Sequence, residues 1–247
     1  MPRYFLEVAY KGTNYSGSQI QKNANTVQAE IEKALYVVCR VSVSLTGSSR
    51  TDAGVHALQN YFHFDFDTTL PSTLVYKLNA VLPPDIALIN LLLVSNDAHA
   101  RFHALSREYE YHIYRKKNPF IRETAFYFPY SLNLEILKDT SAIIKEQTNF
   151  SAFCKTNTQS TNSVCVVQAS NWRIENGVLI YRVKANRFLR GMVRALTATQ
   201  LQVARGAISI EGFTELFDEP GRKCTFSTPP TGLTLVTVCY PQSCFPS

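Results

Sequence analysis

The 247-residue sequence has no long apolar run. None of its hydrophobic stretches approaches the roughly 20 residues that a membrane-spanning helix needs. Its first seven residues, Met1 to Glu7, also lack the apolar centre of a signal peptide. They have the pattern of a first strand instead. These absences exclude a membrane-spanning protein and lead us to expect a cytoplasmic one.

Ligand-binding motifs are missing as well. The sequence has six cysteines, but none forms a CxxC pair, so neither a disulfide framework nor a zinc site is expected. His99 and His103 are four residues apart, yet no third ligand accompanies them, and a loop or packing role is favoured. The nucleotide motifs GxGxxG and GxxxxGK[ST] do not occur. We therefore predict no metal and no cofactor.

What remains is the composition of a folded, water-soluble chain. Hydrophobic residues make up 45% of it and the mean hydropathy is −0.09. Its length suits one large domain or two small ones, with a core that needs no disulfide bonds.

Positive charge is concentrated in the second half. The net charge is +6, but residues 1–105 carry eight basic and eight acidic side chains. Residues 106–247 carry seventeen basic and eleven acidic ones, and the stretch from Arg182 to Arg205 has six basic residues and no acidic one. A one-sided basic field indicates a polyanionic partner. An ordinary solvated cationic surface is the alternative.

Hydrophobic spacing predicts an α+β fold made of two similar halves. The first half reads β-α-β-β-α-β, with strands at 4–10, 41–46, 59–67 and 86–94 and helices at 27–39 and 71–80. The second has strands at 107–115, 164–173, 178–185 and 233–240, helices at 133–146 and 186–204, and a loop at 155–163. We predict two ferredoxin-like (split βαβ) domains, 1–105 and 106–247, with antiparallel sheets flanking a central cleft.

The segment from Arg50 to Ala57 joins two predicted strands and is rich in polar groups. In extended geometry Arg50 and Asp52 lie on one face of the chain. An arginine beside a carboxylate favours its ionised form, and an ionised carboxylate held in place can act as a nucleophile. The alternative is a structural turn closed by an Arg–Asp ion pair.

Two further segments carry candidate binding residues. On a strand, Tyr109 and Tyr111 point to one face, where an aromatic ring can stack on a base or pack across strands. Packing is favoured for Tyr111. Arg187, Arg190 and Arg194 are spaced to form one stripe of a helix. Without acidic partners such a stripe is self-repelling unless an anion such as RNA phosphate lies against it.

These segments together resemble the tRNA pseudouridine synthase A (TruA) family over residues 4–240. The family's Gly-Arg-Thr-Asp-Ala-Gly-Val-His is present with Ser49 in place of the first glycine. Phe-His-Ala followed by Arg-x-Tyr-x-Tyr, Lys-Ala-Asn-x-Phe followed by Met-Val-Arg, and Gly-Leu-x-Leu also match. Tyr-Asp-Gly-Thr-x-Tyr-x-Gly matches with Lys11 replacing the aspartate, and Ser18 stands where the family usually has tryptophan.

The resemblance assigns roles to individual residues. It makes Asp52 the catalytic nucleophile and Arg50 its ion-pair partner. It places Arg194 in the active site, Tyr109 against the target base and Leu233 packed beside that base. Arg187 and Arg190 are then expected to contact the RNA backbone or to be solvated.

The resemblance also implies a reaction and partners. Uridines 38, 39 and 40 in the anticodon stem-loop of tRNA are expected to become pseudouridine, which moves the glycosidic bond from N1 to C5. The expected enzyme is a homodimeric isomerase that needs no cofactor. The RNA-binding and catalytic groups are expected to line the central cleft.

Two other classes of protein remain. One is an RNA-binding protein of the same fold that has lost its activity, in which Asp52 is dispensable. The other is a glycoside or nucleoside hydrolase, which needs a second carboxylate as acid and base. Asp65 and Asp67 lie on one strand in this sequence, but neither sits in a suitable motif.

Overall fold

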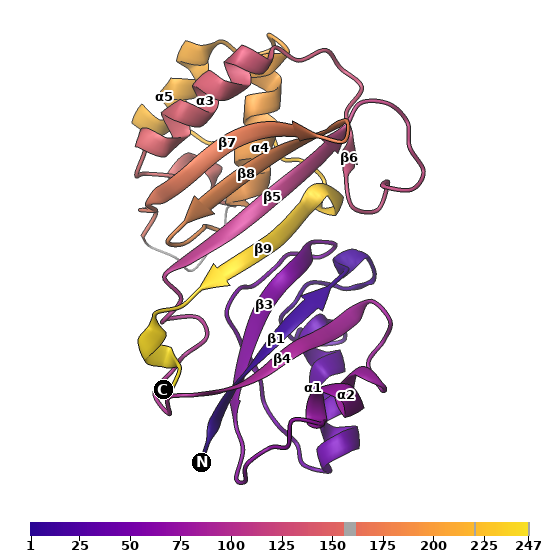
Figure 1. Cartoon of the computed structure of the whole chain (residues 1–247). Helices are drawn as coiled ribbons and strands as arrows, with labels where there is room; N and C mark the ends of the chain where they lie inside the picture. Colours follow the sequence, from indigo (N-terminus) through magenta and orange to yellow (C-terminus); the bar gives the residue numbers. More distant parts are fainter. Residues whose placement is uncertain (156–161, 220, 247) are drawn as a thin grey trace. The chain divides into compact units, whose positions relative to one another are not determined.

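The computed structural model describes residues 1–155, 162–219 and 221–246, and the chain forms two compact units (Figure 1). The first contains Met1–Ser106 and Thr234–Ser247, and the second contains Arg107–Leu233. The first boundary lies beside the predicted join. The sequence-based division kept the C-terminal segment in the second domain, whereas the structure groups it with the first unit. Most of the loop predicted at 155–163 lies outside the described residues.

The first unit is a mostly antiparallel sheet with two helices together on one side of it (Figure 1). Its elements are β1 (Arg3–Tyr10), α1 (Val27–Cys39), β2 (Thr46–Gly47), β3 (His56–Asp65), α2 (Leu74–Asn79), β4 (Ile86–Val94) and all of β9 (Leu233–Cys239) except Leu233, which belongs to the second unit. β1 lies between β4 and β3, β2 pairs with β3, and β9 joins β3 in parallel at His56 and Ala57. The predicted β-α-β-β-α-β order of elements is therefore present.

The strand predicted at 41–46 is reduced to the two residues of β2. Its backbone is bound by side chains of α1 in place of a neighbouring strand: Leu45 N donates to Glu32 Oε1 at 2.8 Å, and Gln28 Nε2 donates to Leu45 O at 2.8 Å. Buried groups satisfied in this way need no ladder partner. The segment that precedes residues 48–55 is therefore largely a loop, and it is hydrogen-bonded to α1.

A buried histidine in β3 makes the first unit sensitive to acid. The pKa of His63 is lowered to about 4, chiefly by burial and further by the nearby His99 and Arg3, with Asp65 opposing. Since the unfolded chain binds a proton near pH 6.5, the stabilising effect of neutral His63 is complete above that pH and is lost as the pH falls towards 4.

We expect the free energy of unfolding to decline between pH 6.5 and 4, measured by denaturant titration. His63→Asn, which keeps an acceptor for the Ala100 N–H, should show a shallower decline over this range. Equal slopes for the two proteins would contradict this assignment. The carboxyl of Asp65, whose pKa is lowered by its bond to Arg3, acts in the more acidic range below about 3.8.

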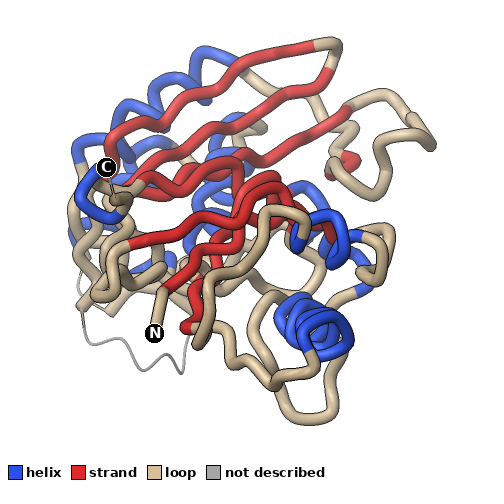
Figure 2. The backbone as a smooth tube through the Cα atoms, turned by 60° about the horizontal axis from the view of Figure 1, so that its bottom comes forward, coloured by secondary structure: helices blue, strands red, loops and turns tan. Residues whose placement is uncertain are grey.

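The second unit combines three helices with a mostly antiparallel sheet. Its elements are β5 (Ser106–Tyr114), β6 (Phe126–Tyr127), α3 (Leu134–Glu146), β7 (Val167–Glu175), β8 (Val178–Ala185), α4 (Met192–Ala204) and α5 (Ile210–Asp218). β8 lies between β5 and β7, and these strands run side by side in Figure 2. Asn176 and Gly177, at φ 50° and 77°, form the two-residue turn between β7 and β8.

The helix predicted at 186–204 begins six residues late, and this corrects the arginine stripe. Asn186 Oδ1 accepts hydrogen bonds from Arg187 N at 2.8 Å and Val166 N at 2.9 Å, and Gly191 adopts φ 76° before α4 starts at Met192. An asparagine that binds nearby backbone N–H groups competes with helix formation. Only Arg194 is helical, so Arg187, Arg190 and Arg194 do not form one helical stripe.

A fifth helix, α5, was not predicted. Ser209 caps it by accepting a hydrogen bond from Gly212 N at 3.0 Å. Phe213 and Phe217 on its inner face pack against Phe153, with ring centroids 6.4 and 4.9 Å away. A mixed α+β architecture with mostly antiparallel strands is confirmed. No helix in the described ranges is long and apolar enough to cross a membrane.

Candidate functional site

Asp52 lies in the loop of residues 48–55, which leads from β2 to β3. Its side chain is half-buried, and the flanking Thr51 is 7% exposed. A turn fixes the backbone, because Val55 N donates to Asp52 O at 3.1 Å and Gly54 N donates to Tyr15 O at 3.3 Å. These two hydrogen bonds fix the backbone that carries the Asp52 carboxylate.

Ser18 forms hydrogen bonds to this loop. Ser18 is 1% exposed, and its hydroxyl donates to Ser49 O at 3.2 Å and accepts from Thr51 N at 2.9 Å. Ser18 N also donates to Thr51 O at 3.1 Å. Ser18 and Ser49, two of the departures from the family pattern, therefore meet in the structure.

A second set of buried hydrogen bonds holds the loop from the sheet. Tyr10 of β1 bonds through its hydroxyl to Thr51 Oγ1 at 2.8 Å. Asn60 of β3 donates to Tyr10 Oη at 3.1 Å and to Ser49 O at 3.2 Å, and its Oδ1 accepts from Ser48 Oγ at 2.7 Å. All five side chains are buried, so the residues on either side of Arg50 have little freedom.

Ser18→Ala is expected to loosen this loop. The change leaves the Thr51 N–H buried without an acceptor, which costs about 1–3 kcal/mol in the free energy of unfolding. Denaturant titration measures this loss, and catalytic turnover should fall with it. Ser16→Ala, at an exposed position of the same segment, is the matched control and should change stability by less than about 0.5 kcal/mol. Equal stability of the two variants would contradict the role assigned to Ser18.

Arg50 is exposed and pairs with no carboxylate among the described residues of the first unit. Its side chain lines an open hollow of about 520 Å³ together with His99, Arg101 and Phe102. Sequence reasoning did not single out this hollow as a site. The signal that was available is the closeness of Arg101 and Phe102 in the sequence, a cation beside an aromatic ring.

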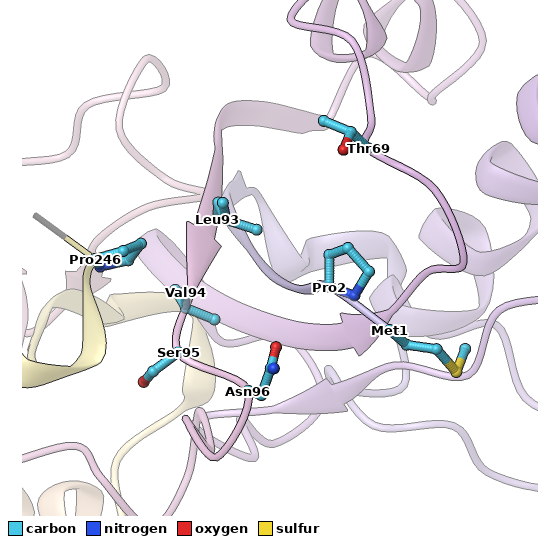
Figure 3. Close-up of a pocket in the computed structure, with 8 residues that line it drawn as sticks. All are labelled: Met1, Pro2, Thr69, Leu93, Val94, Ser95, Asn96 and Pro246. Carbon is cyan, nitrogen blue, oxygen red and sulfur yellow. The ribbon is translucent and has the colours of Figure 1, made fainter.

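Another hollow of about 480 Å³ lies near the N-terminus (Figure 3). The residues around it are Met1, Pro2, Thr69, Leu93, Val94, Ser95, Asn96 and Pro246. None of these side chains ionises between pH 2 and 12, so they offer no acid, base or charged nucleophile.

Tyr109 is in the middle of β5 in the second unit. Its side chain is 9% exposed, and its ring meets that of Phe188 edge to face at 5.1 Å between centroids. Tyr111 is completely buried and donates to Pro229 O at 2.7 Å, so it has the packing role expected of it. Burial raises the pKa of Tyr111, and this phenol stays protonated at neutral pH.

Arg194 is placed by the first turn of α4. Its Nε donates to Thr228 O at 2.7 Å, while Thr228 N and Oγ1 donate to Arg194 O at 3.3 and 3.2 Å. Its side chain is half-buried, as is that of Arg187, whereas Arg190 is exposed. Arg194 therefore has a fixed direction, in contrast to a freely solvated arginine.

Leu233 starts β9 and is 7% exposed. The preceding Gly232 comes so close to the buried ring of Tyr111 that an added Cβ would lie 2.7 Å from it. Gly232 therefore packs on Tyr111, which belongs to the same strand, β5, as Tyr109. Leu233 follows Gly232 directly in the sequence. The second unit thus carries Tyr109, Leu233 and the three arginines, and the first unit carries Asp52 and Arg50.

The second carboxylate that a hydrolase needs is not available at Asp65. Both oxygens of Asp65 accept hydrogen bonds from Arg3, at 2.7 and 2.8 Å, and this lowers the pKa of the carboxyl. A carboxylate held ionised cannot serve as a general acid near neutral pH. Among the described residues, no group of three or more His, Cys, Asp or Glu side chains could hold a metal ion. The six cysteines are free thiols.

Comparisons with known proteins cover the whole chain. A family model described as tRNA pseudouridine synthase matches residues 147–241. The tRNA pseudouridine synthase A of Parabacteroides distasonis is 39% identical over 100% of this chain and 99% of its own. That of Azobacteroides pseudotrichonymphae is 38% identical over 99% of each chain, and that of Bacteroides thetaiotaomicron is 39% identical over 99% of this chain and 93% of its own. The chain therefore belongs to the tRNA pseudouridine synthase A family, a family of isomerases.

Proposed function

We propose that this protein converts uridine to pseudouridine at positions 38, 39 and 40 of the tRNA anticodon stem-loop, with Asp52 as the nucleophile and without a cofactor. The observation that carries the proposal is the placement of Asp52, a half-buried carboxylate on a loop held by buried hydrogen bonds from Ser18, Tyr10 and Asn60. Such a carboxylate is positioned before the substrate arrives, which is what nucleophilic catalysis requires.

The reaction is balanced without an added reactant. Attack by the Asp52 carboxylate at C1′, or at C6 of the base, leads to cleavage of the bond between C1′ and N1. The base rotates and forms a bond from C5 to C1′. The proton on C5 then leaves to solvent, N1 gains a proton, and the carboxylate is released unchanged. No oxidation or reduction takes place.

Other residues act on the same substrate in this proposal. Tyr109 stacks on the target base once it leaves its helix, and Leu233 packs beside that base. Arg50 and Arg194 supply positive charge that holds the Asp52 carboxylate in position. Arg187 and Arg190 contact phosphates of the RNA. This agrees with the absence of acidic residues from Arg182 to Arg205 in the sequence.

Three further properties are part of the proposal. Both units are of the ferredoxin-like (split βαβ) type, which the order of elements in the first unit supports. The enzyme acts in the cytoplasm, where tRNA is modified, and it does so as a homodimer. Sedimentation velocity tests the dimer: a single species with the mass of one 27.8 kDa chain would contradict it.

The test is to map pseudouridine in a tRNA transcript treated with the purified protein. The transcript carries uridine at positions 38, 39 and 40 and elsewhere, and modified sites are read by carbodiimide-dependent stops of reverse transcription. We expect stops for these three positions alone. Modification at other positions would overturn the proposed specificity. Intact RNA binding without any modification would favour the inactive RNA-binding protein.

A further inference from the structure

The hollow beside Arg50 lies directly next to the loop that carries Asp52. Ser49 and Arg50 from that loop line it, and so does Ser18, which is hydrogen-bonded to the loop. His99, Arg101 and Phe102, in the segment of residues 98–102, line it as well. A ligand in this hollow therefore touches the residues immediately before the proposed nucleophile.

Phe102 has a largely exposed aromatic ring. Its side chain is 72% exposed, although it lines the hollow. His99 lies against it, with ring centroids 4.3 Å apart and planes 33° apart, and the guanidinium of Arg101 is 5.7 Å from its centroid. These neighbours orient the ring while leaving most of its surface accessible.

The turn that presents Phe102 is held in one conformation. Arg101 N and Phe102 N both donate to His99 Nδ1, at 3.1 and 3.3 Å, and His103 N donates to His99 O at 3.0 Å. A ring fixed in this way loses little conformational freedom when it binds a partner. This explains the spacing of His99 and His103 without a metal ion.

The charge of the hollow is positive. Its lining contains two arginines, Arg50 and Arg101, and one carboxylate, Glu32. That carboxylate already accepts hydrogen bonds from Leu45 N at 2.8 Å and Gln28 Nε2 at 2.9 Å, which draws it towards the protein. An exposed aromatic face with two cations suits a nucleotide, which combines a flat base with a phosphate. The volume of about 520 Å³ is in the range of ligand pockets.

We propose that this hollow binds a nucleotide of the RNA substrate adjacent to the target uridine, with its base stacked on Phe102 and its phosphate near Arg50 and Arg101. This inference rests on the proposed function, because it takes the RNA strand entering the Asp52 loop as the ligand. It adds a binding subsite whose residues, apart from Arg50, have no role assigned in the reaction.

Phe102→Leu tests the subsite, because leucine keeps an apolar side chain but has no aromatic face. Because this variant loses the stacking on one base, its Kd for an anticodon stem-loop RNA should rise about 5- to 100-fold. Its kcat at saturating RNA should be nearly unchanged. Phe102→Trp should restore the wild-type Kd. Tyr76→Leu, which removes another exposed aromatic ring of the same unit outside the hollow, is the matched control and should bind as wild type does.

A fluorescent base locates the contact directly. With 2-aminopurine placed in turn at each nucleotide flanking the target, binding of wild-type protein should quench one neighbour, and Phe102→Leu should abolish that quenching. Unchanged Kd and unchanged quenching in Phe102→Leu would overturn the subsite, even if the wild type modifies the RNA normally. Conversely, a Phe102-dependent Kd with no pseudouridine formed by the wild type would support the subsite and reject the proposed activity.

Discussion

Asp52→Asn is expected to abolish pseudouridine formation while the fold and RNA binding persist. The amide has the size of the carboxylate but is not nucleophilic, and loss of a catalytic nucleophile lowers kcat by on the order of 10⁴-fold or more. Asp52 is half-buried at the surface of its loop, so we expect the free energy of unfolding to change by less than about 1 kcal/mol. Tritium release from RNA labelled at C5 of uridine measures the reaction, since C5 loses its hydrogen when it bonds to C1′.

Asp67→Asn is the matched control for this experiment. Asp67 is an exposed carboxylate of the same unit, just after β3, and its replacement should leave tritium release unchanged. Release by Asp52→Asn within tenfold of the wild-type rate would mean that another group is the nucleophile. A large drop in RNA affinity for Asp52→Asn would mean instead that Asp52 acts in binding.

Gly12→Ala is expected to displace the same loop by steric overlap. A Cβ at this position would lie 2.0 Å from Val55 O and 2.7 Å from Val55 C, both backbone atoms three residues after Asp52. These atoms belong to the segment that is held by the Val55 N bond to Asp52 O and the Gly12 N bond to His56 Nδ1, so a shift there disturbs both bonds. We expect the free energy of unfolding to fall by about 2–4 kcal/mol and turnover to fall at least tenfold.

Gly212→Ala separates this overlap from the general effect of adding a methyl group. On α5 the new Cβ would meet only side-chain atoms, at 3.3 and 3.5 Å, and alanine favours helix more than glycine does. This variant should keep wild-type activity and be equally or more stable. Denaturant titration and tritium release on both variants make the comparison. A Gly12→Ala protein with wild-type stability and turnover would contradict the close approach of Gly12 to the loop.

Much of the secondary structure followed from local patterns. The predicted ranges 27–39, 86–94 and 178–185 coincide with α1, β4 and β8, because each has a clear hydrophobic pattern and clear ends. The start of α4 was missed, since the side chain of Asn186 binds backbone N–H groups that a helix would use. Only β2 remained of the strand at 41–46, because α1 supplied the hydrogen bonds that a strand neighbour would have supplied.

For the site, the sequence located the residues but not what holds them. The segment from Arg50 to Ala57 identified Asp52, and its position in a loop between strands is confirmed. Ser18 is 33 residues from Thr51 and Tyr10 is 41 residues away, and no periodic pattern indicates that they bond to it. The hollow at Phe102 likewise brings together five segments that are separate in the sequence. Such contacts depend on tertiary packing, which single-sequence reasoning does not reach.

The most direct test of the central claim is one reaction with two readouts. Wild-type protein is incubated with anticodon stem-loop RNA whose uridine is labelled at C5 with tritium and in the ring with carbon-14, in buffer containing a metal chelator. The account predicts tritium in water in proportion to pseudouridine formed, with all of the carbon-14 still in the RNA. Carbon-14 released as free uracil would show a hydrolase, and no tritium release despite RNA binding would contradict the assigned reaction.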